Sequence, residues 1–156
     1  MRVLILYLFS LTYCDAIKLG FIVMESAPEP FDIRRLGPAV DIALEASVTE
    51  YNVTFELERR TYPGVCPYEP PPGLFSELYH KHDIRALLGP ACSQGVLSVG
   101  RLAAYFGVPM VTGLGDLIVR RPEDPYKSLT ILSYDLQKLS CKYCLIVLRF
   151  KLRLRW

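Results

Sequence analysis

The chain has 156 residues, of which 51% are hydrophobic and 22% are charged, and its formal net charge is +2. This composition supports one folded domain of ordinary size and excludes a disordered body. Residues 142–156 carry five basic and no acidic side chains, whereas residues 17–141 carry 12 basic and 15 acidic ones. Because the body is slightly acidic, the charge argues against a nucleic-acid-binding protein.

Residues 1–16 have the features of a secretory signal peptide. Arg2 supplies a positive charge, residues 3–13 carry none, and Ala16 is a small residue at a plausible cleavage point. The uncharged run is too short to span a membrane, and a buried N-terminal strand is the alternative. We therefore expect a mature chain that begins near Ile17 and enters the secretory pathway.

Predicted strands and helices alternate in the first part of the body. An apolar run predicts a buried strand at residues 19–24, and two prolines predict a loop at residues 25–31. Apolar residues at three- and four-residue spacing predict a helix over residues 37–51, with Pro38 in its first turn. The alternation of apolar and polar residues at positions 53–58 predicts a half-buried strand.

The second part of the body continues the alternation. Five prolines predict a loop over residues 62–73, followed by a short helix at residues 74–82. A longer helix is predicted at residues 93–106, and further strands at residues 86–88, 108–112 and 129–132. This order predicts an α/β fold of three layers, with a mostly parallel sheet and helices on both faces.

Ligands of such sheets bind beyond the carboxyl ends of the strands, so three loops are candidates for ligand binding. They are residues 25–32, 89–94 and 113–116. The second loop contains Gly89-Pro90-Ala91-Cys92-Ser93, between a buried strand and a helix. A turn there directs the amide groups of a helix N-terminus at open space, which suits an anion or a polar ligand group. The alternative is that Ser93 only caps the helix.

That motif and the residues RLAAYFGVPMVT at positions 101–112 closely resemble the extracellular ligand-binding region of receptor guanylate cyclases. This is the natriuretic-peptide-receptor family, which is built on the type 1 periplasmic-binding fold. The helix start Gly37-Pro38-Ala39-Val40 also matches, and the resemblance covers roughly residues 18–139. It implies that residues 17–139 are an incomplete first lobe, followed by a divergent basic tail at residues 140–156.

The resemblance also assigns roles to single residues. It implies a disulfide between Cys66 and Cys92, with two free buried thiols as the alternative. It implies an anion or ligand contact at Ala91, Cys92 and Ser93, where the family binds chloride. The serine that contributes to the family's chloride site is replaced here by Arg59.

Two copies of the family's lobe pair through the helices that match residues 74–82 and 93–106. Carried over by position, the contact residues are Glu77, His80, Leu102 and Tyr105. The alternative is that these are ordinary solvent-facing residues.

Four further motifs have the residue types of modification, metal or nucleotide sites. Asn52-Val53-Thr54 is an N-glycosylation sequon, which we expect to be occupied. His80-Lys81-His82 predicts a solvated helix surface, because imidazoles two residues apart point in different directions. Gly113-Leu114-Gly115-Asp116 lacks the third glycine of a dinucleotide turn, and Cys141-Lys142-Tyr143-Cys144 lacks a second pair of zinc ligands. No metal site is therefore expected.

The function implied by the resemblance is reception of an extracellular peptide signal by a longer, homodimeric receptor that makes cyclic GMP at the plasma membrane. We expect this chain itself to be non-catalytic, with chloride as its one candidate ion. The alternatives are an amino-acid or small-molecule receptor module of the same fold, a soluble decoy or clearance receptor, and a nucleotide-binding α/β enzyme. We expect the tail to be an alternative carboxyl terminus without selected function. A cationic segment at a membrane surface is the other interpretation.

Overall fold

The computed structural model describes residues 16–27, 31–64, 66, 68–115, 118 and 125–133. Residues 1–15 of the predicted signal peptide and the whole basic tail lie outside the described residues, as do Asp116, Cys141 and Cys144. In the described part, five strands form one sheet in the order β2-β1-β3-β4-β5, with every pair parallel. Their bounds are β1 Ile17–Glu25, β2 Phe55–Pro63, β3 Ala86–Leu88, β4 Met110–Thr112 and β5 Leu129–Ile131.

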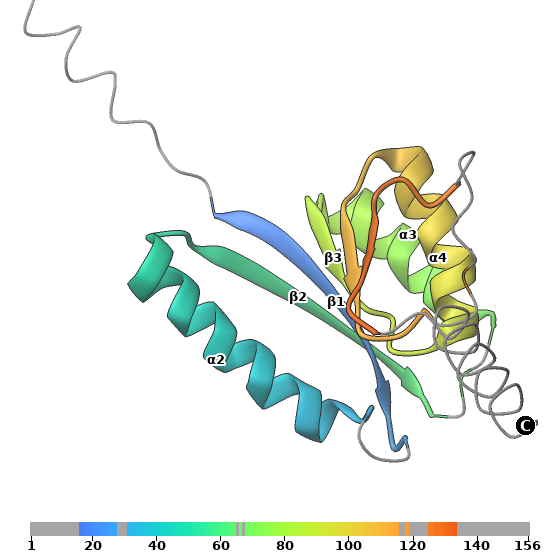
Figure 1. The fold of residues 1–156 in the computed structure, drawn as a ribbon, viewed down its shortest axis with the longest axis horizontal. Helices are drawn as coiled ribbons and strands as arrows, with labels where there is room; N and C mark the ends of the chain where they lie inside the picture. Colours follow the sequence, from blue (N-terminus) through green and yellow to red (C-terminus); the bar gives the residue numbers. More distant parts are fainter. Residues whose placement is uncertain are drawn as a thin grey trace, which may run out of the picture.

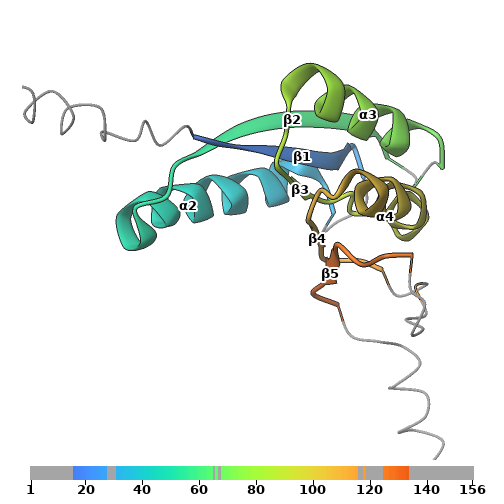
Figure 2. The ribbon, with the colours of Figure 1, turned by 90° about the horizontal axis from the view of Figure 1, so that it is seen from above.

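Helices cover both faces of the sheet, so the predicted three-layer α/β fold is confirmed. Helix α2 (Ile33–Tyr51) lies on one face, and α3 (Pro70–His82) and α4 (Ser93–Phe106) lie on the other (Figure 1). Figure 2 shows the sheet edge-on between these layers, with a strong twist from β2 to β5. We refer below to the α2 face and the α3–α4 face.

Strand β1 is central because both of its faces are buried. Ile22 and Met24 belong to the core on the α3–α4 face, whereas Phe21, which is 5% exposed, lines the opposite face together with Leu36 and Val40 of α2. A strand covered on both sides needs a continuous apolar sequence, which explains the uninterrupted run in β1. The predicted buried first strand is therefore confirmed.

The main core lies between the sheet and the α3–α4 layer. It is formed by fully buried side chains from both helices and from three strands: Phe75, Leu78, Val96, Val99, Ala103, Ile22, Leu87 and Met110. Burial of each large side chain in this set stabilises the fold by about 1.5–3 kcal/mol. Leu87 and Met110 face each other in the β3–β4 register, so the core continues across neighbouring strands.

Helix α2 begins four residues earlier than the sequence predicted. Asp32 is its N-cap and accepts a hydrogen bond from the Arg34 amide at 2.8 Å, so the first turn starts at Ile33 instead of Gly37. Pro38 consequently lies inside the helix and not in its first turn. At the sixth helical position it removes only one backbone hydrogen bond, the one that Arg34 would accept.

The predicted loop over residues 62–73 is wrong at both ends. Strand β2 continues to Pro63, because it pairs with β1 residue by residue as far as Glu25, and proline is tolerated in an edge strand. Helix α3 begins at Pro70 and holds three prolines in its first turn. Amide groups in a first turn have no intrahelical acceptor, so proline removes nothing there and its fixed φ favours the helix.

The loop between β1 and α2 depends on one carboxylate, which generates the first prediction. Asp32 is only 6% exposed and accepts hydrogen bonds from the amides of Arg34 and Ala27, the second at 3.0 Å. The Arg34 hydrogen bond is the main reason that the pKa of Asp32 lies below its ordinary value of 3.8. The ionised carboxylate therefore contributes stability above that ordinary pKa, and the contribution is lost as the pH falls through the folded-state pKa.

We expect Asp32→Ala to lower the thermal unfolding midpoint at pH 7 by several degrees, and Asp32→Asn to lower it less, because an amide oxygen still caps α2. The gap between wild type and Asp32→Asn should begin to close near pH 4 and should vanish once the pH has fallen through the folded-state pKa of Asp32, where the wild-type carboxyl group is neutral. Circular dichroism melts across pH 3 to 7 measure this. Parallel curves for these two proteins would contradict the assigned role.

Candidate functional site

The three candidate loops meet at the carboxyl edge of the sheet. Met24 and Asp32 form an isolated bridge there, which closes the loop after β1. The amide of Gly89, directly after β3, donates to the Val111 carbonyl of β4 at 2.8 Å. The Thr112 hydroxyl, at the end of β4, donates to the Pro90 carbonyl at 2.9 Å. The loops after β3 and β4 are therefore bonded to each other, and the loop after β1 lies at the same edge, because β1, β3 and β4 are parallel.

Helix α4 opens at this edge. Its N-cap is Cys92, and Ser93 is the first helical residue, so the interpretation of Ser93 as the cap is wrong by one position. Cys92 is 1% exposed and offers no side-chain capping bond. The amino end of this 14-residue helix carries partial positive charge, which suits an anion or a carboxylate.

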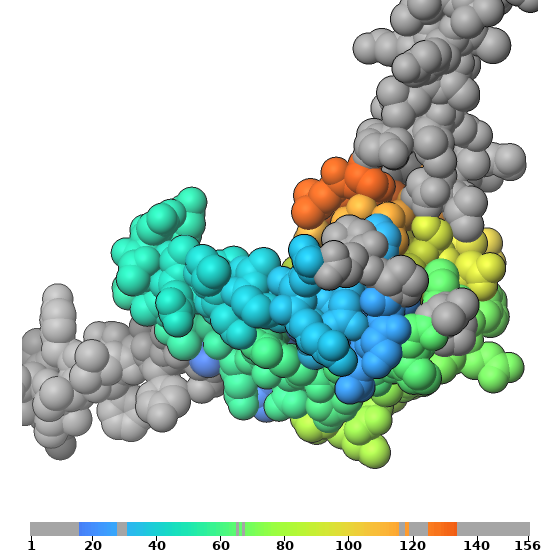
Figure 3. Space-filling model, turned by 90° about the horizontal axis from the view of Figure 1, so that it is seen from below, coloured from blue at the N-terminus to red at the C-terminus, as the bar shows by residue number. Residues whose placement is uncertain are grey.

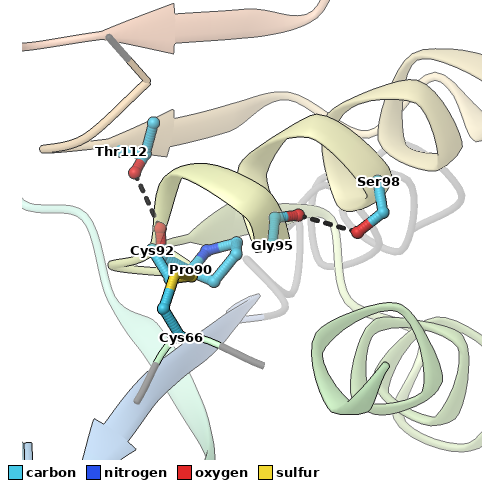
Figure 4. The surroundings of a disulfide bond; sticks show 6 residues. All are labelled: Cys66, Pro90, Cys92, Gly95, Ser98 and Thr112. Atoms are coloured by element: carbon cyan, nitrogen blue, oxygen red, sulfur yellow. Dashed lines mark hydrogen bonds between the residues drawn. A yellow bond between two sulfur atoms is a disulfide. The ribbon is translucent and has the colours of Figure 1, made fainter. Parts of the chain in front are cut away.

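A disulfide joins Cys66 to Cys92, the pair implied by the family resemblance, with 5.4 Å between the Cα atoms. Cys66 lies in the connection from β2 to α3, so the bridge ties that connection to the start of α4 (Figure 4). On the other side, the Thr112 hydroxyl bonds to Pro90 and accepts from the Leu114 amide at 3.2 Å. The loop before α4 is thus held from two directions.

Two glycines allow this loop to pack closely. Gly89 has a φ of +84°, and a Cβ there would collide with the Ile22 carbonyl oxygen of β1. A Cβ on Gly95, in the first turn of α4, would lie 3.0 Å from Pro71 and 3.1 Å from Pro90. The glycine at position 89 is therefore required by both the backbone conformation and the space.

Arg59 does not join the amino end of α4. It lies opposite Phe21 in the β1–β2 register, and its guanidinium forms an ion pair with Asp41 of α2. Its Nη1 atom lies near Gly37 of the same helix. The structure therefore places this cation on the α2 face, where it links β2 to α2.

An apolar groove on the α2 face reaches the same edge, and sequence reasoning missed it. Its volume is about 330 Å³, and its walls come from β1, α2, β3, β4 and the residues after β4 and β5. The main apolar side chains are Phe21, Leu36, Val40, Leu88, Val111 and Leu132. Gly89 and Ala91 also line it, so it borders the loop before α4. The apolar pair Leu36 and Val40, four residues apart on α2, indicated one wall of the groove. The opposite wall comes from strands far apart in the sequence, so no local pattern indicated it.

The four predicted contact residues lie on the two neighbouring helices α3 and α4. Tyr105 is 84% exposed, and Phe106 beside it contacts both Tyr105 and His80, with ring centroids 5.2 and 5.7 Å apart. Leu102 is half-buried against the core. The Glu77 carboxylate lies within 4 Å of two cations of the same chain, on Arg60 and Lys81.

His80 and Lys81 are exposed, as expected for a solvated helix surface, whereas His82 is half-buried and has partners on β2. Its Nε2 atom lies 2.6 Å from the Arg60 guanidinium, and its Nδ1 atom lies 3.3 Å from the Glu58 carboxylate. The side chain therefore joins α3 to β2. No group of three or more metal-binding side chains is found within the described part of the chain.

Asn52 ends helix α2. It is exposed, has a left-handed φ of 54°, and its amide contacts the carbonyls of Ser47 and Val48. The sequon therefore lies on the surface, at the turn from α2 into β2. No helix of the described residues is long and apolar enough to cross a membrane.

The disulfide generates the second prediction. It closes a loop with a sequence separation of 26, so replacing Cys66 and Cys92 by alanine should lower the free energy of unfolding by about 3.5 kcal/mol in the chain-entropy model. Cys66→Ala alone should be almost as destabilising, because one substitution already opens the loop. Denaturant unfolding measures both variants, and peptide mapping without reduction should recover the linked pair from wild type. A double variant with wild-type stability would reject the stabilising role.

No family model matches the chain. In sequence it is 29% identical over 123 residues to guanylate cyclase 2G of Mus musculus, and 33% identical over 78 residues to atrial natriuretic peptide receptor 2 of Bos taurus. These matches cover 74% and 50% of this chain, but only 11% and 7% of the two relatives. The chain thus spans a small part of the curated relatives that it matches.

In structure the chain is similar to bacterial solute-binding proteins. One is an ABC-transporter protein from R. palustris in complex with 4-hydroxybenzoate, with a TM-score of 0.57, 20% identity, and 78% of this chain and 32% of that chain covered. Another is the leucine-binding protein LivK of Thermotoga maritima, with a TM-score of 0.53, 17% identity, and coverage of 77% and 33%. The chain therefore has the fold of the type 1 periplasmic-binding proteins over about one third of their length, and its resemblance to the receptor guanylate cyclases is confirmed.

Proposed function

We propose that this chain is part of the extracellular ligand-binding region of a receptor guanylate cyclase, and that residues 17–139 are its incomplete first lobe. One observation carries the proposal: the sequence match to guanylate cyclase 2G extends over 123 residues of a chain that folds like part of a binding protein. In the longer receptor, this lobe would help to receive a peptide signal that raises cyclic GMP. The chain itself would contribute binding surface and no catalysis.

In this proposal the amino end of α4 holds chloride or an anionic ligand group. Ala91, Cys92 and Ser93 would offer backbone amide groups, and the disulfide and the Thr112 hydroxyl fix the loop that carries them. Arg59 is engaged with Asp41, so the proposed site depends on the amides and the helix end instead of a side-chain cation.

A small-molecule binding module is the second candidate function. The apolar groove of about 330 Å³ beside the α4 amino end favours it, because an apolar wall next to a polar helix end suits a compact acid. Two of the solved structures with this fold hold 4-hydroxybenzoate and isoleucine.

Transcripts that encode residues 87–113 test the family assignment directly. We expect a longer transcript to encode a membrane span and a cyclase domain downstream of the region that matches residue 139. A downstream sequence that encodes a second lobe without a membrane span would favour the small-molecule module.

Binding by the mature chain, residues 17–156, provides the third prediction. We expect no binding of natriuretic peptides by calorimetry at micromolar concentration, because such ligands need surface from a second lobe and usually from a second protomer. A small acid panel that includes 4-hydroxybenzoate and leucine tests the other candidate. Tight peptide binding by a monodisperse monomer would overturn this view and support a soluble decoy.

Entry into the secretory pathway provides the fourth prediction, through the sequon at Asn52. Thr54→Ala should remove one N-glycan, seen as loss of the mobility shift on glycosidase treatment, whereas Thr54→Ser should retain it. These variants leave the Asn52 cap of α2 unchanged, so folding is matched. If the wild-type chain carried no glycan before glycosidase treatment, the result would contradict the proposed glycosylation of Asn52 in the secretory pathway.

Pairing of two lobes through α3 and α4 provides the fifth prediction. In a full-length ectodomain that carries this lobe, Tyr105→Asp should weaken dimerisation by about tenfold or more, because a charge replaces an exposed aromatic side chain of the proposed interface. Ile42→Asp on α2 is the matched control, since that side chain is 68% exposed on the opposite face. Analytical ultracentrifugation measures both, and equal dimerisation of the two variants would reject the α3–α4 interface.

A further inference from the structure

The α2 face of the sheet is only partly covered within the described residues. Helix α2 packs on β1, while β3, β4 and β5 have their helices on the opposite face. The apolar groove lies over this uncovered part, with Phe21, Leu88 and Val111 on the sheet and with Leu36 and Val40 on α2. Figure 3 shows α2, in cyan, and the β5 region, in orange, on one side of the molecule.

The chain leaves the sheet at the rim of this groove. Leu132, directly after β5, lines the groove and is 72% exposed, and its amide donates to the Thr112 carbonyl at 2.9 Å. This hydrogen bond holds the exit point beside β4. The end of the described chain therefore lies next to an apolar surface.

The sequence after Ser133 has an apolar stripe of helical spacing. Leu136, Leu139, Tyr143 and Ile146 are separated by three, four and three residues, and Lys138 and Lys142 fall off the stripe. A helix of this length is about 10 Å wide, comparable with the span from β3 to β5 at about 4.8 Å per strand.

The order of the strands also favours a connection on the α2 face after β5. The step from β1 to β2 places α2 on its face, and the opposite steps, from β2 towards β3 and β4, place α3 and α4 on the other face. Connections between parallel strands are right-handed. By the same rule, a connection that leaves β5 for a parallel strand further towards β2 would cross on the α2 face.

We propose that residues 134–147 form a helix that docks its apolar stripe into the groove beside α2. This segment completes the third layer and covers Leu132 and Val111. It also supports Gly89 and Ala91, which line the groove and precede α4. The inference concerns folding of this chain and does not depend on the proposed receptor function.

Hydrogen exchange of the mature chain, residues 17–156, tests the docking. We expect the amides of residues 134–147 to be protected in wild type, and Leu139→Asp to raise their exchange rate by about tenfold or more, because one buried leucine side chain is lost from the contact. Gln137→Asp is the matched control, because it places the same charge on the helix face away from the stripe, and it should stay within about twofold of wild type.

Two substitutions on α2 test the docking independently, from the side of the groove. Val40→Asp should expose residues 134–147 to exchange, whereas Ile42→Asp, two residues away and outside the groove, should not. Far-UV circular dichroism of Val40→Asp shows whether the domain remains folded. If this variant unfolds, the Leu139→Asp measurement still tests the docking, because that substitution changes no residue of the sheet.

Several results would overturn the proposal. One is unprotected exchange of residues 134–147 in wild type, and another is equal exchange in Leu139→Asp and Gln137→Asp. Protection that rises with protein concentration together with a dimer in sedimentation would assign the groove to a second copy. Protection that requires vesicles containing phosphatidylserine would assign the segment to a membrane surface.

Discussion

Strand β1 is covered on both faces and paired on both edges, and the rest of the lobe is built around it. Its register with β2 runs over nine residue pairs, and β3 pairs with Leu19 to Phe21 on the other edge. Ile22 and Val23, adjacent in the strand, are both fully buried although they point to opposite faces. Any shift of this strand would therefore move both layers of helices and the carboxyl edge together.

The candidate site depends on this strand through the loop before α4. Gly89 lies against the Ile22 carbonyl, so the loop passes directly over β1. The Cys66–Cys92 bridge holds the same loop from the β2–α3 connection, and the Thr112 hydroxyl holds it from the end of β4. A helix amino end fixed in this way, beside an apolar groove, suits a ligand that combines a negative group with an apolar body.

Charged side chains link the outer strand β2 to both helix layers. Arg59 pairs with Asp41 of α2, whereas the next residue, Arg60, lies against His82 and Glu77 of α3. Consecutive residues of a strand point to opposite faces, so two adjacent arginines serve opposite layers. These pairs are partly exposed, and each contributes little to the free energy of folding. Their role is to orient the helices on a sheet edge that is otherwise polar.

The sequence by itself determined the α/β class, the buried first strand and the three loops at the carboxyl edge of the sheet. These follow from local patterns, namely apolar runs, helical spacing, and the glycine and proline residues of the turns. The family resemblance added the Cys66–Cys92 pair. The bounds of the helices were less predictable. The start of α2 depends on the hydrogen bonds that the Asp32 carboxylate accepts, and the start of α3 depends on the fixed φ of its three prolines.

Only the tertiary structure decided the partners of the charged side chains and the existence of the groove. The family resemblance aligned Arg59 with a serine of the chloride site, but in the structure Arg59 pairs with Asp41 on the α2 face. His82 was expected in solvent, but β2 brings Glu58 and Arg60 to it. The groove joins Phe21, Val40 and Val111, which lie up to 90 positions apart in the sequence. Such contacts are set by strand order and sheet twist, which no local pattern encodes.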